Sequence, residues 1–289
     1  LQAFDIQLMS LKKNFKLEDL SVFLIVASPE DFTTVDAHVR KCNEKYEGTF
    51  PFRVVSASAI VPEQEYMTKH SETEVAPYYK EHHFGYITRM IAKLSAFEWI
   101  PGEFYLALDA DVMCVKPTSY ATLIPHGKAI TNFGKGKYDT AYQWKGAKHV
   151  LDAPKSMHAD QTVYGGVPSI YHRMAVNKLK TYLEIIYQQP WRYSLLRYLY
   201  GWSDYSLYFS FLKIAGIFDK HHSAVRDGLF RSQDGRIGSD ELQKWGESNL
   251  TPSQDPGYFV HLNGMIELPV SEVNSKIRPY FELGDKTSI

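Results

Sequence analysis

The first 115 residues alternate between short apolar runs and segments with helical periodicity, and this alternation constrains the fold more than any other feature. The apolar runs of strand length are residues 22–27, 52–57 and 104–108, and the helical segments between them are residues 32–42 and 84–99. Strands that alternate with helices predict an α/β fold with a doubly wound, largely parallel sheet.

The turn after the first strand carries the residue types that start helices. Ser28 is expected to cap the first helix, Pro29 suits the first helical position, and Asp31 is a shortened version of the capping-box acid. The helix is therefore predicted to begin directly after residue 28.

Two carboxylates, Asp109 and Asp111, follow the third apolar run. In an extended segment side chains alternate, so both would face one side, about 6.6 Å apart. Carboxylates at the end of a buried strand are typical ligands for Mg²⁺ or Mn²⁺ shared with substrate phosphates. A bare Asp-x-Asp pattern is common, and two acids that only solvate a surface turn are the alternative.

The second half of the chain is less regular. Strands are expected at residues 128–133, 165–171 and 258–262, helices at residues 174–187 and 204–214, and a long irregular stretch at residues 227–257. We expect one large domain of two packed halves, residues 1–115 and 116–289.

Composition excludes several functional classes. Lys and Arg total 32 against 33 Asp and Glu, so there is no basic field for nucleic acid. The two cysteines, Cys42 and Cys114, fit reduced thiols, and we expect a cytoplasmic protein. No run of 18 apolar residues predicts a transmembrane segment. The chain begins at Leu1, so a leader or anchor could precede it.

These features together resemble one enzyme family. The segment from Gly85 to Leu94, the Asp109 strand, the downstream run from Gly165 to Pro168 and the late His261 are similar to glycosyltransferases of the GT-A fold, especially little-characterised bacterial and viral members. The likeness covers residues 21–264. It implies a GT-A domain with a nucleotide-sugar-binding half and an acceptor-binding half, acting in glycan synthesis.

The resemblance also implies a ligand set. In such enzymes the second acid, here Asp111, binds the metal, and the first, here Asp109, meets the ribose or the metal shell. The C-terminal histidine, here His261, often completes the coordination. The implied cofactor is Mn²⁺ or Mg²⁺, the donor a UDP-sugar, and the acceptor a saccharide hydroxyl. A lone histidine is more often a structural residue, so that alternative stays open for His261.

The donor is expected to contact two further groups of residues. Its base and ribose would lie at the end of the first strand, near Val26, Ala27, Ser28 and Asp31. Arg89 and Lys93 are four residues apart on one helix face and could reach the diphosphate. A solvated cationic face is the alternative for this pair.

An inverting transferase needs a carboxylate that accepts the acceptor's proton. Asp204, at a predicted helix start, is the first candidate, and the resemblance implies an acid there. The second is Asp160, in the run before Gly165. The structural alternative is that Ser203 caps the helix while Asp204 favours its dipole.

Two other classes remain open. A phosphatase of the haloacid dehalogenase type also ends a buried strand with Asp-x-Asp and uses the first acid as nucleophile. Its motif is usually near the N-terminus, with Thr or Val where Met113 stands here. A sugar- or nucleotide-binding module without turnover is the non-enzymatic alternative.

Overall fold

The computed structural model describes residues 1–65, 83–135, 138–154, 156–157, 162–197, 201–232, 239–250, 257–261 and 269–282. The helices among them are α1 (Gln2–Asn14), α2 (Phe32–Lys45), α3 (Ala57–Ile60), α5 (His83–Ser95), α6 (Tyr120–Leu123), α7 (Tyr138–Val150), α8 (Arg173–Tyr187), α9 (Trp191–Arg197), α10 (Asp204–Ile214), α11 (Phe218–His221), α12 (Ser239–Asn249) and α13 (Val270–Ile277). The strands are β1 (Phe23–Ala27), β2 (Phe52–Ser56), β3 (Phe104–Ala107), β4 (Val112–Cys114), β5 (Ala129–Lys135), β6 (Thr162–Tyr164), β7 (Ser169–His172), β8 (His222–Val225), β9 (Phe230–Ser232) and β10 (Phe259–His261).

The mixed α/β class is confirmed, but the sheet is not the continuous doubly wound one expected. Over the described ranges the strands form four small sheets, with orders β1-β2, β3-β7, β4-β10-β9 and β6-β5-β8. β1 and β2 pair in parallel, as expected. β3 instead pairs antiparallel with β7, from the second half of the chain. The two halves therefore share a pairing that the local sequence pattern does not reveal.

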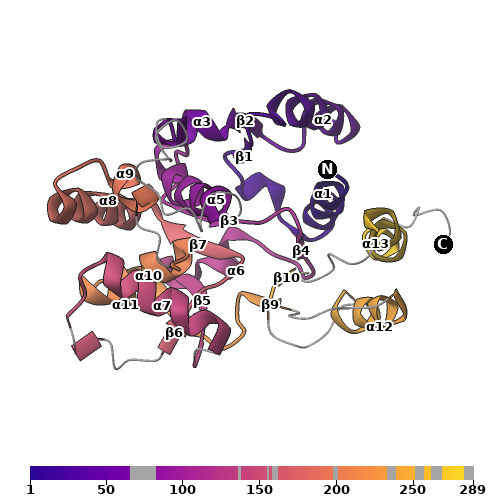
Figure 1. Cartoon of the computed structure of the whole chain (residues 1–289). Helices are drawn as coiled ribbons and strands as arrows, with labels where there is room; N and C mark the ends of the chain where they lie inside the picture. Colours follow the sequence, from indigo (N-terminus) through magenta and orange to yellow (C-terminus); the bar gives the residue numbers. More distant parts are fainter. Residues whose placement is uncertain are drawn as a thin grey trace.

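Helices cover the strands on more than one side (Figure 1). On one side α5, α7, α8, α9 and α10 bury the largest apolar cluster, which includes Trp191, Trp202 and Phe209. On the other, α1 and α2 pack over β1 and β2 through residues such as Phe4 and Val39. α13 lies beside α1, so the two ends of the described chain are close together (Figure 1).

Several element predictions need correction. α2 begins at Phe32 and not after Ser28, because Ser28 closes a turn by accepting from the Asp31 N–H. The strand expected at residues 165–171 starts only at Ser169. The stretch predicted as irregular contains β9 and α12. α1 was missed altogether.

α10 begins with a capping box, as the structural alternative predicted. The Ser203 and Ser206 side chains each accept from the other's backbone N–H. The apolar side chains that follow are buried on all sides, which is typical of a central helix.

Two neighbouring histidines lie against α10 and are held neutral. The Tyr208 hydroxyl lies 2.9 Å from Nε2 of His222. It also accepts a hydrogen bond from the backbone N–H of His172 at 3.0 Å. Burial lowers the pKa of His222 to about 3 and that of His221 to about 4. The imidazole of His222 is therefore uncharged in the folded chain at neutral pH.

This burial predicts a pH-dependent stability. The unfolded chain gains a proton on His222 below its ordinary pKa of about 6.5. Because the folded chain does so only near pH 3, stability falls as the pH drops from about 6.5. Between pH 7 and pH 5 we expect the free energy of unfolding of His222→Gln to fall by about 2 kcal/mol less than that of the wild type. Urea unfolding at both pH values measures this, with exposed His126→Gln as control. Equal losses in wild type and variant would contradict it.

No helix in the described ranges is both long and apolar enough to cross a membrane.

Candidate metal centre

The two acids lie in a tight turn and not in an extended strand. β3 ends at Ala107, and the Val112 N–H donates to the Asp109 carbonyl at 3.1 Å, which closes a turn around Ala110. The side chains therefore converge because the chain turns, and not because strand side chains alternate. The expectation of two acids on one side of an extended strand was therefore wrong in its geometry, although the turn brings a ligand atom of each acid within 4.8 Å of the other.

His261 joins the acids through strand pairing. β10 lies antiparallel to β4, and their register sets His261 opposite Val112, the residue after Asp111. Nε2 of His261 lies 3.3 Å from Oδ1 of Asp111. One ligand atom from each of Asp109, Asp111 and His261 lies within 4.8 Å of the other two. A cluster of two carboxylates and an imidazole at this spacing is suited to a divalent cation.

The state of Asp111 fits a metal ligand. Its buried Oδ1 lies 3.3 Å from Nε2 of His261, although the side chain as a whole is 45% exposed. Burial alone would raise the pKa of Asp111, but the adjacent His261 outweighs it, so the pKa lies below its usual value. The carboxylate is therefore ionised at neutral pH, which is the state in which a carboxylate binds a divalent cation.

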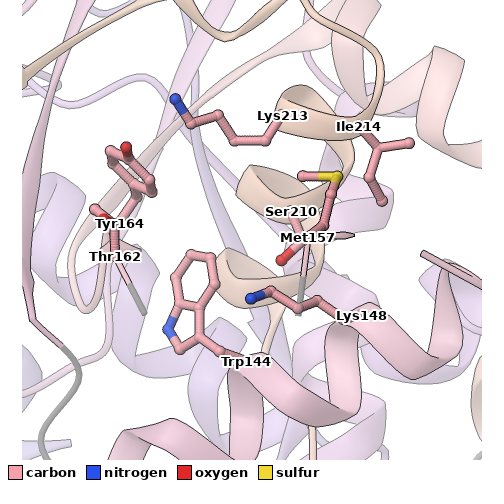
Figure 2. A pocket seen from close by; sticks show the side chains of 8 residues that line it. All are labelled: Trp144, Lys148, Met157, Thr162, Tyr164, Ser210, Lys213 and Ile214. Atoms are coloured by element: carbon pink, nitrogen blue, oxygen red, sulfur yellow. The ribbon is translucent and has the colours of Figure 1, made fainter. Parts of the chain in front are cut away.

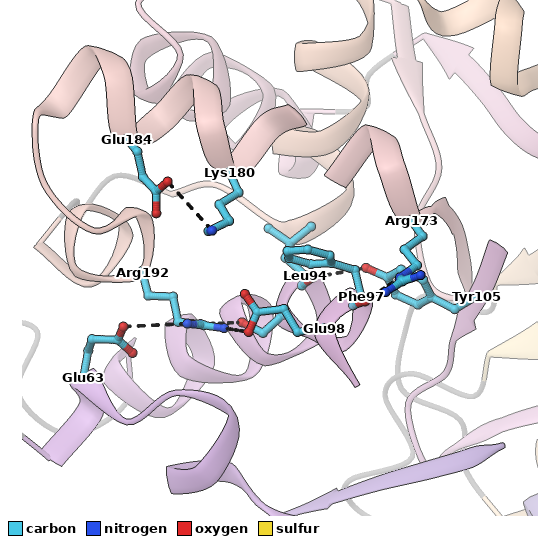
Figure 3. A network of polar contacts seen from close by, with 10 residues as sticks. Glu63, Leu94, Phe97, Glu98, Tyr105, Arg173, Lys180, Glu184 and Arg192 are labelled. Carbon is cyan, nitrogen blue, oxygen red and sulfur yellow. Dashed lines mark hydrogen bonds and ion pairs between the residues drawn. The ribbon is translucent and has the colours of Figure 1, made fainter. Parts of the chain in front are cut away.

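Lys93 forms an ion pair with the other acid of the cluster, Asp109. Its Nζ lies 2.6 Å from Oδ1 of Asp109, and its side chain is only 11% exposed. Burial opposes the charge on Lys93, but Asp204 and Asp109 outweigh it, so the pKa of Lys93 is raised. The Tyr105 hydroxyl donates to the carbonyl of Lys93 and to that of Leu94, the second of which is shown in Figure 3, and so fixes the end of α5 against β3.

An arginine from the second half of the chain also fixes this end of α5. Arg192 forms ion pairs with Glu98 and, at 3.8 Å, with Glu63 (Figure 3). Its Nε donates to the Ser95 hydroxyl at 2.9 Å. Because the guanidinium is largely buried, this network holds the helix that carries Lys93 in a defined position.

Asp204 lies fully buried beside this cluster. Its Oδ2 accepts a hydrogen bond from the Tyr171 hydroxyl, while Oδ1 has no hydrogen-bond partner within the described ranges. Burial raises the pKa of Asp204, and Asp109 adds to the rise, whereas Lys93 and Tyr171 oppose it. Asp204 therefore interacts electrostatically with Lys93 and Asp109, in addition to lying at the start of α10 next to Ser203.

The turn that carries the two acids is held in place by α1, a helix that was not predicted from the sequence. The Gln7 amide donates to the carbonyls of Asp109 at 2.6 Å and of Val112 at 3.1 Å, and its side chain is buried. The apolar spacing of Phe4, Leu8 and Leu11 is the signal that could have revealed this helix.

The same face of α1 satisfies the free edge of β4. The Ser10 hydroxyl accepts from the Cys114 N–H at 3.0 Å, and the Asn14 amide donates to the Cys114 carbonyl at 2.7 Å. With Gln7, these residues repeat at intervals of three and four, as one helix face does. Polar helix side chains thus take the place of a further strand beside β4.

Gln7→Ala should therefore destabilise the protein. It leaves two carbonyls without their side-chain donor, which costs about 1–3 kcal/mol. Urea denaturation measures this cost. The matched control is Gln243→Ala on the exposed face of α12, where we expect a change within about 0.5 kcal/mol. A Gln7 variant as stable as this control would show that α1 does not hold the turn.

The other predicted site residues contact the cluster of Asp109, Asp111 and His261 less closely. The Arg89 guanidinium lies over the Tyr86 ring at 5.5 Å, and its charge lowers the pKa of Lys93, so it is near the cluster but exposed. Of the residues predicted to contact the nucleotide base and ribose, Val26 and Ala27 are the last two of β1, and Ser28 and Asp31 follow it. Ser28 donates to Asp31 at 2.9 Å, and the described contacts of this group do not reach the acids. Asp160 lies outside the described residues.

A separate pocket lies between α7, α10 and β6 (Figure 2). Its walls include Trp144, Tyr164 and Lys213, and the Lys213 ammonium stands 5.1 Å from the Tyr164 ring centre. Ser210, buried on α10, also lines it. Since Ser210 and Asp204 are six residues apart on α10, the pocket is about 9 Å along the helix from Asp204. It is therefore distinct from the cluster of acids.

Comparisons with known proteins give a family but no activity. The chain belongs to a family of unknown function, DUF6492, whose model matches residues 1–285. No curated protein matches it. Among solved structures, the apo form of mouse xyloside xylosyltransferase 1 is similar at 10% sequence identity and a TM-score of 0.48, over 93% of each chain. This degree of similarity is too low to assign a shared activity.

Proposed function

We propose that this protein is a metal-dependent glycosyltransferase of the GT-A type, which transfers a sugar from a nucleotide-diphosphate donor to a saccharide hydroxyl. The observation that carries the proposal is the convergence of Asp109, Asp111 and His261, whose ligand atoms lie within 4.8 Å of one another. A donor set of two carboxylates and one imidazole suits Mn²⁺, and Mg²⁺ less well. Bound there, the ion would neutralise the charge of a diphosphate leaving group.

The residues around the cluster support the handling of an anionic donor. Lys93 orients the Asp109 carboxylate through an ion pair at 2.6 Å, and the exposed Arg89 is available to the diphosphate. In this proposal residues 1–115 bind the nucleotide, with its base and ribose near Val26 and Asp31, and residues 116–289 bind the acceptor. A UDP-sugar is the donor that we favour.

Asp204 is the proposed base of an inverting transfer. The acceptor hydroxyl would give its proton to Oδ1 of Asp204 while its oxygen bonds to the anomeric carbon and the diphosphate leaves. A carboxylate with a raised pKa is the better proton acceptor, and Tyr171 fixes its orientation. Asp160 is the second candidate. A product that keeps the donor's α configuration would remove this role from Asp204.

Isothermal titration with UDP and with GDP, each with and without Mn²⁺, tests the proposal. Binding of one nucleotide only in the presence of Mn²⁺ supports a transferase site and identifies the donor base. Absence of binding by both nucleotides contradicts it.

A second test separates the proposal from a phosphatase. If Asp109 were a nucleophile, phosphorylated protein would form on incubation with a phosphate ester, and Asp109→Asn would abolish it. A transferase forms no phosphoenzyme, and the same variant loses only nucleotide affinity that depends on Mn²⁺. Detection of the phosphoenzyme would therefore overturn the transferase assignment.

A further inference from the structure

A second group of metal-binding side chains lies between α1 and α2, away from the turn that carries the two acids. His38 and Cys42 are four residues apart on α2 and so share one face of that helix. Asp5 faces them from α1. One ligand atom from each of these three residues lies within 4.8 Å of the other two.

The contacts within this group are already close to a coordination shell. Nε2 of His38 lies 2.7 Å from Oδ1 of Asp5, and Sγ of Cys42 lies 3.7 Å from the same oxygen. Around a tetrahedral zinc ion, neighbouring ligand atoms are separated by roughly 3.3–3.6 Å, given the usual bond lengths. Sulfur and oxygen are thus near their final spacing, and the imidazole needs to move by about 0.6 Å.

The types of ligand atom in this group indicate which metal ion it would bind. A thiolate and an imidazole favour zinc over the harder Mg²⁺ and Mn²⁺, which prefer oxygen ligands. We propose that Asp5, His38 and Cys42 form a zinc site that fastens α1 to α2, with water as the fourth ligand. The Asp5 and His38 side chains are 40% and 23% exposed, which leaves solvent access for that water.

A catalytic role for Cys42 fits the geometry less well. A cysteine nucleophile needs an imidazole or another cationic group as its immediate partner. Here the thiol donates to the Asp5 carboxylate, and the imidazole binds the same carboxylate.

The site would also support the turn that holds the two acids. Asp5 lies two residues before Gln7, so the two side chains point to different faces of α1. Asp5 faces α2, and Gln7 holds the carbonyl of Asp109. A zinc ion that fixes α1 against α2 would therefore fix the helix on which the Asp109 turn rests.

Titration of the metal-free full-length chain with Co²⁺, a spectroscopic substitute for zinc, tests this site. We expect a thiolate-to-cobalt charge-transfer band that saturates at one equivalent and disappears when Zn²⁺ is added. Cys42→Ser should lose the band. Cys114→Ser, which removes the other buried thiol, and Asp111→Ala, which removes the other cluster's ligand, should keep it.

Two results would overturn the proposal: absence of the band in the wild type, or its persistence in Cys42→Ser. Should Cys42→Ser fail to fold, His38→Gln serves instead, because His38 is partly exposed and its loss should be tolerated. We expect this variant to bind Co²⁺ at least tenfold more weakly, and an unchanged affinity would count against the site. None of these readouts depends on transferase activity.

Discussion

Asp111→Ala should weaken Mn²⁺-dependent nucleotide binding at least a hundredfold, equivalent to about 2.7 kcal/mol. The carboxylate is ionised, because the adjacent His261 keeps its pKa below the usual value. The substitution removes one of the two carboxylates of the cluster, the one whose Oδ1 lies 3.3 Å from Nε2 of His261. Isothermal titration of UDP with and without Mn²⁺ measures the effect.

The control is Asp36→Ala, which removes a carboxylate of α2 that pairs with the exposed Arg40. It should bind nucleotide as the wild type does. Stability should change little in Asp111→Ala, since the side chain is 45% exposed, so weaker binding would not reflect unfolding. Unchanged Mn²⁺-dependent affinity in this variant would remove Asp111 from the metal site.

Lys93→Met should destabilise the fold by about 3 kcal/mol at neutral pH. The substitution keeps the volume of the side chain but leaves the buried Asp204 and the half-buried Asp109 without their cation. Uncompensated buried charge is among the most costly changes in a protein interior. Urea denaturation measures the loss.

The pH dependence of that loss identifies its cause. The pKa of Lys93 is raised on folding, so its stabilisation is complete below its ordinary pKa of about 10.4 and declines as the pH rises through the higher folded value. The pKa of Asp204 is also raised, so this acid takes up its proton at a higher pH than an ordinary carboxyl, and the penalty in Lys93→Met shrinks as the pH falls. A penalty that is the same at pH 4.5 and pH 7 would contradict the electrostatic account.

Two further variants separate charge from packing. Lys180→Met on α8 breaks a partly exposed pair with Glu184 at 3.9 Å (Figure 3), and we expect it to cost less than about 1 kcal/mol. Combining Lys93→Met with Asp204→Asn should recover part of the lost stability, because the buried charge is then absent. Strict additivity of the two substitutions would show that Lys93 and Asp204 do not interact.

Local patterns predicted most of the first half of the fold. The apolar runs at β1, β2 and β3 and the amphipathic α2 and α5 lie where the sequence predicted them, except that α2 begins at Phe32 and not directly after Ser28. These elements depend on contacts within a few residues, which a periodic pattern records directly. α1 also has helical spacing, but polar Gln7, Ser10 and Asn14 lie between its apolar positions and weaken the pattern.

The sequence by itself determined the strand that leads to Asp109 and Asp111, and the helix that carries Lys93, because these depend on local periodicity. Only the tertiary structure decided that β10 pairs with β4 and so brings His261 to Asp111, about 150 residues away along the chain. The same holds for the burial of Asp204 and for the meeting of Asp5 with His38 and Cys42. Such contacts arise from the packing of separate elements, and the residues that meet there carry no shared local pattern.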